Sequence, residues 1–315
     1  MAIAQENRRR PAEGLASVPW LTPWTTSLRD GALHFTNSEM LKAAVLYLLV
    51  PEEIDMLVSS ILLLREHFLH AFAYPVVIFY PPGLHPEQLK DFQAKVPKGV
   101  QAFWLELPGF GQLPEGLDLA DVPDALQKDK DFPLINHITR FWWAQVWQHP
   151  LVQHLDYFLR LDSDSFVLAP IEYDVFRYMH LNQLAYGYIT ESYDGPEWTV
   201  GLFDLVEATK SVSAEAQQHA AGNNLWLPPV DERDKHGPRM FYTNFEVVDV
   251  QRVLNDAQYM AFVATVDQTH NIYTRRWMDG PLRWHAAMLF WDFKADTRQF
   301  CDIDYFHQGR IQHSC

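Results

Sequence analysis

Residues 157–166 of the chain read YFLRLDSDSF, and this stretch decides the fold class. A mostly apolar run, beginning at Leu155 and ending at Leu161, predicts a buried strand, and Asp162-Ser163-Asp164 follows it directly. In open parallel sheets, ligands gather at the carboxyl ends of the strands. The stretch therefore predicts a strand of an α/β sheet with a polar site at its end.

The segments before this strand alternate between strand and helix patterns. Apolar runs at 42–50, 75–80 and 100–107 predict buried strands. Apolar residues at helical spacing within 51–68 predict a helix, and a second helix is expected at about 85–94. Such alternation is typical of a mostly parallel central sheet flanked by helices. The fold class is therefore α/β.

Composition and patterning divide the chain into a leader and a folded part. The 315 residues are 48% hydrophobic, which is enough to bury a sizeable core. Residues 1–40 are rich in Pro, Arg and small polar residues, so we expect a leader or stem-like linker there. Residues 41–315 are expected to form a single domain. Within it, residues 108–133 lack periodicity and predict a long loop, which in compact domains is usually functional.

The charge of the chain argues against several classes of partner. With 25 Lys and Arg against 40 Asp and Glu, the formal net charge is −15, which repels nucleic acids and anionic lipids. The most apolar stretch, 45–64, contains a proline and three acidic residues, so it predicts no membrane span. The two cysteines, Cys301 and Cys315, allow at most one clip of the C-terminal tail. We expect no nucleic-acid partner and no membrane span in this chain.

The Asp-x-Asp pattern occurs three times, at 129–131, 162–164 and 302–304. The first lies in a charged loop and is expected to be solvated surface. The second stands between two apolar runs, where carboxylates are costly unless they are paired, open to a cleft or bound to a cation. Mg²⁺ and Mn²⁺ accept such oxygens and bridge them to a diphosphate. The competing interpretation is an ordinary turn capped by aspartates.

Several ordered motifs resemble a known family. Residues 58–61, with Arg65, resemble the family's LVSSIR. Residues 157–166 resemble YYWRVEPDVKF, residues 171–176 resemble INYDVF, and the similarity continues through 185–188. Later in the chain, 244–246 resemble NFE, 276–281 resemble RWGDAP and 302–307 resemble DIGYYH. Their order and spacing agree over about residues 42–310. On these motifs the chain resembles a divergent member of the fungal-type α-1,2-mannosyltransferases, glycosyltransferase family 15.

The resemblance implies a GT-A fold and a metal-dependent transfer of mannose from GDP-mannose, with retention of configuration, in α-1,2 linkage to a glycan acceptor. Mn²⁺ or Mg²⁺ is the implied cofactor, and a nucleotide sugar and a glycan are the implied partners. Residues 41–168 would form the nucleotide-binding half and residues 169–315 the acceptor-binding half. The family pattern implies a Golgi or secretory location if an anchor has been removed, and a cytoplasmic one otherwise.

The resemblance also assigns a metal and nucleotide site. Asp162, Asp164 and His307 occupy the positions of the metal-binding motif, and the two aspartates together with Arg140 would bind the nucleotide diphosphate. His307 could instead be a histidine that is only hydrogen-bonded within a strand. Arg140 could instead be an ordinary solvent-facing arginine.

Glu246 matches the carboxylate of NFE, so the resemblance implies that it is the catalytic group. It would act as a nucleophile in double displacement, or stabilise positive charge in a front-face reaction, and the sequence does not separate these. The competing interpretation is a carboxylate that faces water from an alternating strand. Trp277 and Asp279 are candidates for acceptor binding, although a helix cap is the simpler role for Asp279.

The chain departs from the family at two places. Asp162 and Ser163 stand where the family has Glu and Pro. The family's tyrosine in the segment before the acidic strand falls at Ile135, and His137 is a candidate to replace it. Two further functions therefore stay open, a related GT-A transferase that uses another sugar nucleotide and a non-catalytic sugar-binding homologue.

Overall fold

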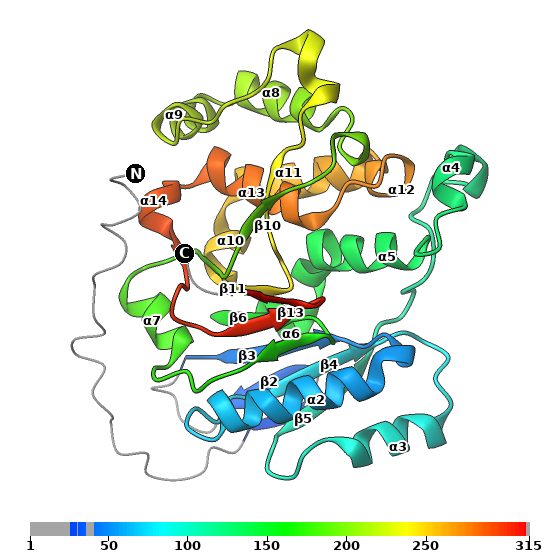
Figure 1. Cartoon of the computed structure of the whole chain (residues 1–315), viewed down its shortest axis with the longest axis vertical. Helices are drawn as coiled ribbons and strands as arrows, with labels where there is room; N and C mark the ends of the chain where they lie inside the picture. The colour runs from blue at the N-terminus through cyan, green and yellow to red at the C-terminus, as the bar shows by residue number, and fades with distance from the viewer. Residues whose placement is uncertain (1–25, 30, 36–40, 313–315) are drawn as a thin grey trace.

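The structure, a computed structural model, describes residues 26–29, 31–35 and 41–312 (Figure 1). Its centre is a seven-stranded sheet. In spatial order the strands are β12 (Thr297–Gln299), β8 (Tyr186–Tyr188), β11 (Phe245–Asp249), β6 (Tyr157–Leu161), β3 (Ala43–Leu48), β4 (Val76–Tyr80) and β5 (Ala102–Glu106). Only β11 runs antiparallel to its two neighbours, and the other pairs are parallel. The prediction of a mostly parallel sheet is confirmed.

Helices cover both faces of the sheet (Figure 1). One face is covered by α2 (Ile54–Leu64), α3 (Pro86–Lys95) and α7 (Val175–Leu181). The other is covered by α5 (Leu134–Arg140), α6 (Pro150–Gln153), α10 (Val250–Asn255), α11 (Ala257–Gln268), α12 (Asn271–Thr274), α13 (Asp279–Phe290) and α14 (Phe293–Asp296). Farther from the sheet, α9 (Ala214–Gly222) packs against α13, and α8 (Leu202–Val212) packs against α9 (Figure 1). None of the helices in the described ranges is long and apolar enough to cross a membrane.

The alternation of side chains along β3 explains why its whole run is apolar. Ala44, Leu46 and Leu48 belong to the core on the α13 side of the sheet, and Val45 and Tyr47 to the core on the α2 side. All six residues of the strand are buried. A strand buried on both faces is expected to be continuously hydrophobic rather than alternating.

The same alternation places two charged residues in the core. On β6, Phe158 packs on the α13 side, while Leu159 packs on the α2 side, so Arg160 faces α13. Glu246 on β11 lies directly opposite Arg160 in the strand register. The sheet therefore presents a buried pair of opposite charges to α13.

The structure differs from the sequence prediction within the expected leader. Strand β1 (Thr26–Arg29) pairs antiparallel with β2 (Ala32–Phe35), and Leu33 is buried in the α13-side core. The expected loop at 108–133 contains the short helix α4 (Asp124–Gln127). The pairing of Cys301 with Cys315 concerns a residue outside the described part of the chain.

Two smaller sheets lie beside the central one. They consist of β7 (Ser165–Val167), β13 (Tyr305–His307) and β14 (Arg310–Gln312), and of β9 (Glu191–Tyr193) with β10 (Arg239–Phe241). Both join segments that are distant in sequence, and both adjoin the carboxyl end of β6. They therefore build the walls of the site described next.

Candidate active site

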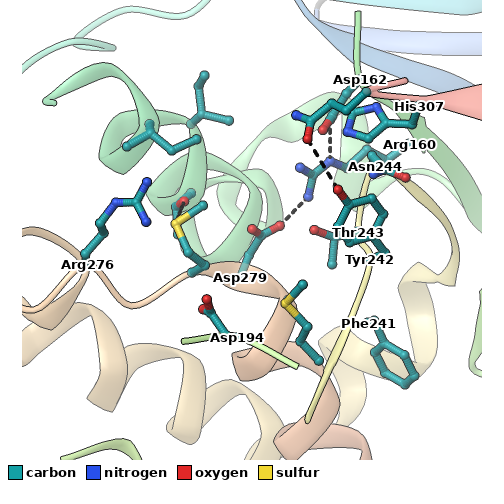
Figure 2. Close-up of a pocket in the computed structure, with 17 residues that line it drawn as sticks. Arg160, Asp162, Asp194, Phe241, Tyr242, Thr243, Asn244, Arg276, Asp279 and His307 are labelled. Atoms are coloured by element: carbon teal, nitrogen blue, oxygen red, sulfur yellow. Dashed lines mark hydrogen bonds and ion pairs between the residues drawn. The ribbon is translucent and has the colours of Figure 1, made fainter. Parts of the chain in front are cut away.

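A cavity of about 380 Å³ opens at the carboxyl end of β6 (Figure 2). Its wall is formed by α5, the end of β6, the segment from β10 to β11, the start of α13 and the end of β13. The acidic, basic and histidine side chains of the wall are Arg160, Asp162, Asp194, Arg276, Asp279 and His307. The position of the cavity agrees with the prediction that ligands bind at the end of this strand.

Asp162 and Asp164 belong to the tight turn that joins β6 to β7. The Asp162 amide donates to the Ser165 hydroxyl over 3.2 Å, and the Ser165 amide donates to the Asp162 carbonyl over 3.1 Å. His307 lies opposite Ser165 in the antiparallel pairing of β13 with β7. Its Nδ1 is consequently 3.0 Å from Oδ1 of Asp164. The structure thus brings together the three residues that the sequence assigned to the metal site.

The donor atoms at this turn suit a divalent cation that is shared with phosphate. Asp162 and His307 line the cavity. In the described ranges, no three His, Cys, Asp or Glu side chains are already arranged around a common metal position. Mg²⁺ sites often use only one or two protein ligands and complete their shell with substrate phosphates and water, and a carboxylate with an imidazole suits Mn²⁺. The residues therefore fit an ion that binds together with a diphosphate.

Glu53 adds a third carboxylate to this region, one that no motif in the sequence had indicated. Burial raises the pKa of Glu53, and the neighbouring Asp164 and Asp162 raise it further. A hydrogen bond with Ser163 opposes this rise in the pKa of Glu53. The signal in the sequence was weaker than for Asp162, because Glu53 does not follow β3 directly but lies in a separate 3-10 turn, Pro51–Glu53.

Arg160 forms the floor of the cavity and connects its acidic groups. Its Nε donates to Asp162 Oδ1 over 3.1 Å, and its Nη1 donates to the carboxylate of Asp279 (Figure 2). Nη1 is also 3.6 Å from Glu246 Oε1. The guanidinium carbon lies 4.5 Å from the ring centre of Trp142. A cation held by three carboxylates and an aromatic ring is fixed in position rather than mobile.

Glu246 lies behind Arg160 and is 0% exposed. It accepts a hydrogen bond of 2.8 Å from the Tyr186 hydroxyl, and its Oε2 is 3.3 Å from Nε of Arg283. Burial raises the pKa of Glu246, and the Arg283 and Arg160 guanidiniums oppose that rise. The interpretation of Glu246 as a water-facing strand residue is wrong, and its carboxylate is one layer beneath the cavity wall.

Helix α13 begins at Asp279, and its first turn faces the cavity. Asp279 and Arg283 are four residues apart and therefore on one face of the helix, above the buried charges of the sheet. The Asp279 carboxylate pairs with Arg160 and forms no cap, and the N-cap residue is Met278. A Cβ on Gly280 would lie 2.6 Å from the backbone oxygen of Phe241, so glycine permits the close approach of α13 to β10.

Arg140 and Trp277 are engaged elsewhere. Arg140 makes a bidentate pair with Asp267, with Nε to Oδ1 at 2.6 Å and Nη2 to Oδ2 at 3.0 Å. Trp277 is buried, and its Nε1 donates to the backbone oxygen of Val200 over 3.0 Å. Both lie outside the cavity wall. The structure therefore gives no support to a diphosphate clamp at Arg140 or to sugar stacking at Trp277.

His137 also faces away from the cavity. Its Nδ1 is 2.8 Å from the Tyr273 hydroxyl, and burial lowers its pKa to about 4. Ile135, which stands at the family's tyrosine position, does line the cavity. His137 thus does not replace the missing phenol, and that part of the wall is apolar.

The mostly parallel sheet, with an acidic turn at the carboxyl end of β6 and a cavity beside it, is the arrangement of the GT-A class of glycosyltransferases. Core-mannan synthase A from Aspergillus fumigatus, solved in its Mn/GDP form, has the same fold with a TM-score of 0.75 at 22% identity, over 97% of this chain and 85% of that one. The mannosyltransferase Ktr4p from Saccharomyces cerevisiae in complex with GDP gives 0.74 at 23% identity, over 87% of this chain and 73% of that one. The GT-A fold expected from the sequence is confirmed.

Residues 24–315 match the family described as glycolipid 2-alpha-mannosyltransferase, and the chain belongs to that family. The probable mannosyltransferase KTR4 of S. cerevisiae is 26% identical over 286 residues, which are 84% of this chain and 60% of that protein. The probable mannosyltransferase KTR3 of the same yeast is 25% identical over 306 residues, 93% of this chain and 73% of that protein. The chain thus spans less than two thirds of the length of the first relative.

Proposed function

We propose that this chain transfers mannose from GDP-mannose to a hydroxyl of a glycan acceptor, with retention of configuration and in α-1,2 linkage. Membership of the family and the names of the relatives support the activity. The observation that carries the proposal is the convergence of Asp162, Asp164 and His307 at one end of a cavity that also contains a buried Arg160–Asp279 pair.

Asp162 and the Nε2 atom of His307 would hold Mn²⁺ or Mg²⁺ in this proposal. Asp164 would act behind them: its carboxylate lies 3.0 Å from Nδ1 of His307, which has no well-formed hydrogen bond among the described residues, and it would orient the ring when the ion binds. The ion would offset the charge of the nucleotide diphosphate as it leaves the sugar. Asp162 stands where the family has Glu, so its side chain is one methylene shorter. The hydrogen bonds between Asp162 and Ser165 in the tight turn set the position of its carboxylate.

Glu246 would act through Arg160 rather than on the sugar itself. A nucleophile must reach the anomeric carbon, whereas Glu246 is fully buried and has the Arg160 guanidinium between it and Asp279. Of the two mechanisms open from the sequence, this burial favours the front-face reaction. Arg160 and Asp279 would then set the charge around the anomeric carbon, where positive charge develops in the transition state.

The proposal is tested with purified protein, a panel of GDP- and UDP-sugars, and methyl α-mannoside as acceptor, with Mn²⁺ or with a chelator. Calorimetry measures binding, and NMR of the product gives the linkage and anomeric configuration. Consumption of GDP-mannose with formation of an α-1,2-mannoside supports the proposal. Transfer from only a UDP-sugar would instead identify a different GT-A transferase. Binding of none of these nucleotides would favour the alternative of a non-catalytic sugar-binding homologue.

A further inference from the structure

Asp194 places an unsatisfied carboxylate oxygen in the cavity wall. It follows β9, and its Oδ1 accepts a hydrogen bond of 2.8 Å from the Gly195 amide. Its Oδ2 is buried and has no hydrogen-bond partner among the residues that the structure describes. An unsatisfied buried acceptor destabilises a protein, so such groups call for an explanation, for example a bound ligand.

Arg276 lies near Asp194 and is held in an unusual conformation. Its φ of 60° is in the left-handed region, which residues other than glycine rarely adopt and which concentrates at functional sites. The guanidinium carbon lies 4.5 Å from the ring centre of Trp198, and Nε is 3.5 Å from Oδ2 of Asp129. Within the described ranges this Nε makes no well-formed hydrogen bond. Trp198 and Asp129 thus hold the Arg276 side chain on two sides, and its Nε remains available to donate a hydrogen bond.

The two residues stand away from the metal-binding turn. In Figure 2, Arg276 is on the opposite side of the cavity from Asp162 and His307, and Asp279 lies between them. Arg276 is close enough to Asp194 to lower its pKa, which burial raises. One buried acceptor and one donor therefore line the same side of one cavity, away from Asp162 and His307.

We infer that Asp194 and Arg276 bind the acceptor sugar by gripping adjacent hydroxyls of a pyranose ring, and so determine which acceptor the enzyme uses. A hydroxyl both donates and accepts a hydrogen bond, so it can donate to Oδ2 of Asp194 while it or its neighbour accepts from Arg276. The donor sugar would be held at the metal end, on the other side of Asp279. This inference rests on the proposed glycosyl transfer.

The test compares the wild-type protein with Asp194→Asn at saturating GDP-mannose and varied methyl α-mannoside. Asn keeps an oxygen for the Gly195 amide but removes the charged acceptor. The acceptor KM is expected to rise roughly ten- to hundredfold, as for the loss of a hydrogen bond to a charged group. The KM for GDP-mannose and the affinity for GDP with Mn²⁺ should stay within about twofold of wild type. Asp231→Asn, at an exposed aspartate outside the cavity, is the matched control.

Deoxy acceptors identify the hydroxyl concerned. Methyl α-mannosides that lack the 3-, 4- or 6-hydroxyl are assayed with the wild type and with Asp194→Asn. The compound that lacks the recognised hydroxyl should be a poor acceptor for the wild type, and its KM should be the same for both proteins. Arg276→Asn removes the donor that would bind the neighbouring hydroxyl, and Asn tolerates the left-handed backbone conformation. This variant should also raise the acceptor KM. An unchanged acceptor KM in both variants, or a loss confined to the donor, would overturn the inference while the transfer activity of the wild type still stands. A wild type that transfers to no acceptor would instead refute the proposed function.

Discussion

Nδ1 of His307 lies 3.0 Å from Oδ1 of Asp164, and the antiparallel pairing of β13 with β7 sets this distance. Asp162, at the start of the same turn, faces the cavity together with His307. The two aspartates of one Asp-x-Asp motif therefore have different surroundings. Asp162 lines the cavity, whereas Asp164 lies beside Nδ1 of His307, and in the proposed function it would orient that ring.

The first prediction separates these two aspartates. Asp162→Ala should abolish Mn²⁺-dependent binding of GDP. Asp164→Asn should weaken it about ten- to hundredfold, because loss of a group that orients a metal ligand typically has that effect. Isothermal titration calorimetry with and without a chelator measures both. Asp131→Asn, at an exposed aspartate in another Asp-x-Asp motif, should bind as the wild type does. Equal losses in both variants at the turn would contradict the division of roles.

The second prediction concerns Glu246. Glu246→Gln keeps the volume and an acceptor for the Tyr186 hydroxyl, but it removes the charge that faces Arg160 and Arg283. Turnover should fall about a hundredfold with little change in the KM for GDP-mannose, since the effect is on transition-state charge. Initial rates at varied donor concentration give both constants.

Glu246→Asp, which retains the charge, is the control and should recover part of the lost turnover. Thermal unfolding of both variants is measured alongside, because removing one member of a buried ion pair costs about 3–5 kcal/mol. A Gln variant with more than about half of the wild-type turnover would show that the buried charge has no part in the reaction.

The third prediction tests how α13 is placed. An alanine at Gly280 would bring its Cβ to 2.6 Å from the backbone oxygen of Phe241, so α13 must shift away from β10. We expect a loss of about 1–3 kcal/mol in the free energy of unfolding, together with lower activity, because Asp279 begins the helix. Urea unfolding measures the change in the free energy of unfolding. Gly222→Ala, at the end of α9 with nothing within 4 Å, should leave both quantities almost unchanged.

The sequence predicted the central sheet well because its strands are buried on both faces. The runs expected at 42–50, 75–80 and 100–107 became β3, β4 and β5 with boundaries shifted by a few residues. Such runs carry their signal locally. The position of Asp162 and Asp164 could be predicted for the same reason, because a strand end is a local feature and the topology of parallel sheets makes it a binding edge.

The burial of Glu246 and the engagement of Arg140 could not be predicted in this way. Glu246 is enclosed because Arg160 on one side and Arg283 on α13 offset its charge, and those partners come from separate elements. Arg140 is taken up by Asp267 on α11. These contacts depend on packing between distant segments, which periodicity and motif spacing do not encode. Asp194 and Arg276 line one cavity for the same reason.

The last prediction concerns His285, which lies within α13 and is 1% exposed. Its Nδ1 is 2.8 Å from the backbone oxygen of Pro281, and burial lowers its pKa from about 6.5 to about 4. Between these values the unfolded chain binds a proton that the folded protein does not, so stability is lost as the pH falls from about 6.5 toward 4. The loss approaches about 1.4 kcal/mol per pH unit, or about 2 kcal/mol at pH 5.

His285→Gln should therefore lose about 2 kcal/mol less than the wild type between pH 7 and pH 5 in urea unfolding, whatever its stability at pH 7. His70→Gln, at an exposed histidine, should keep the wild-type dependence. Parallel pH profiles for the wild type and His285→Gln would show that His285 is not the group responsible.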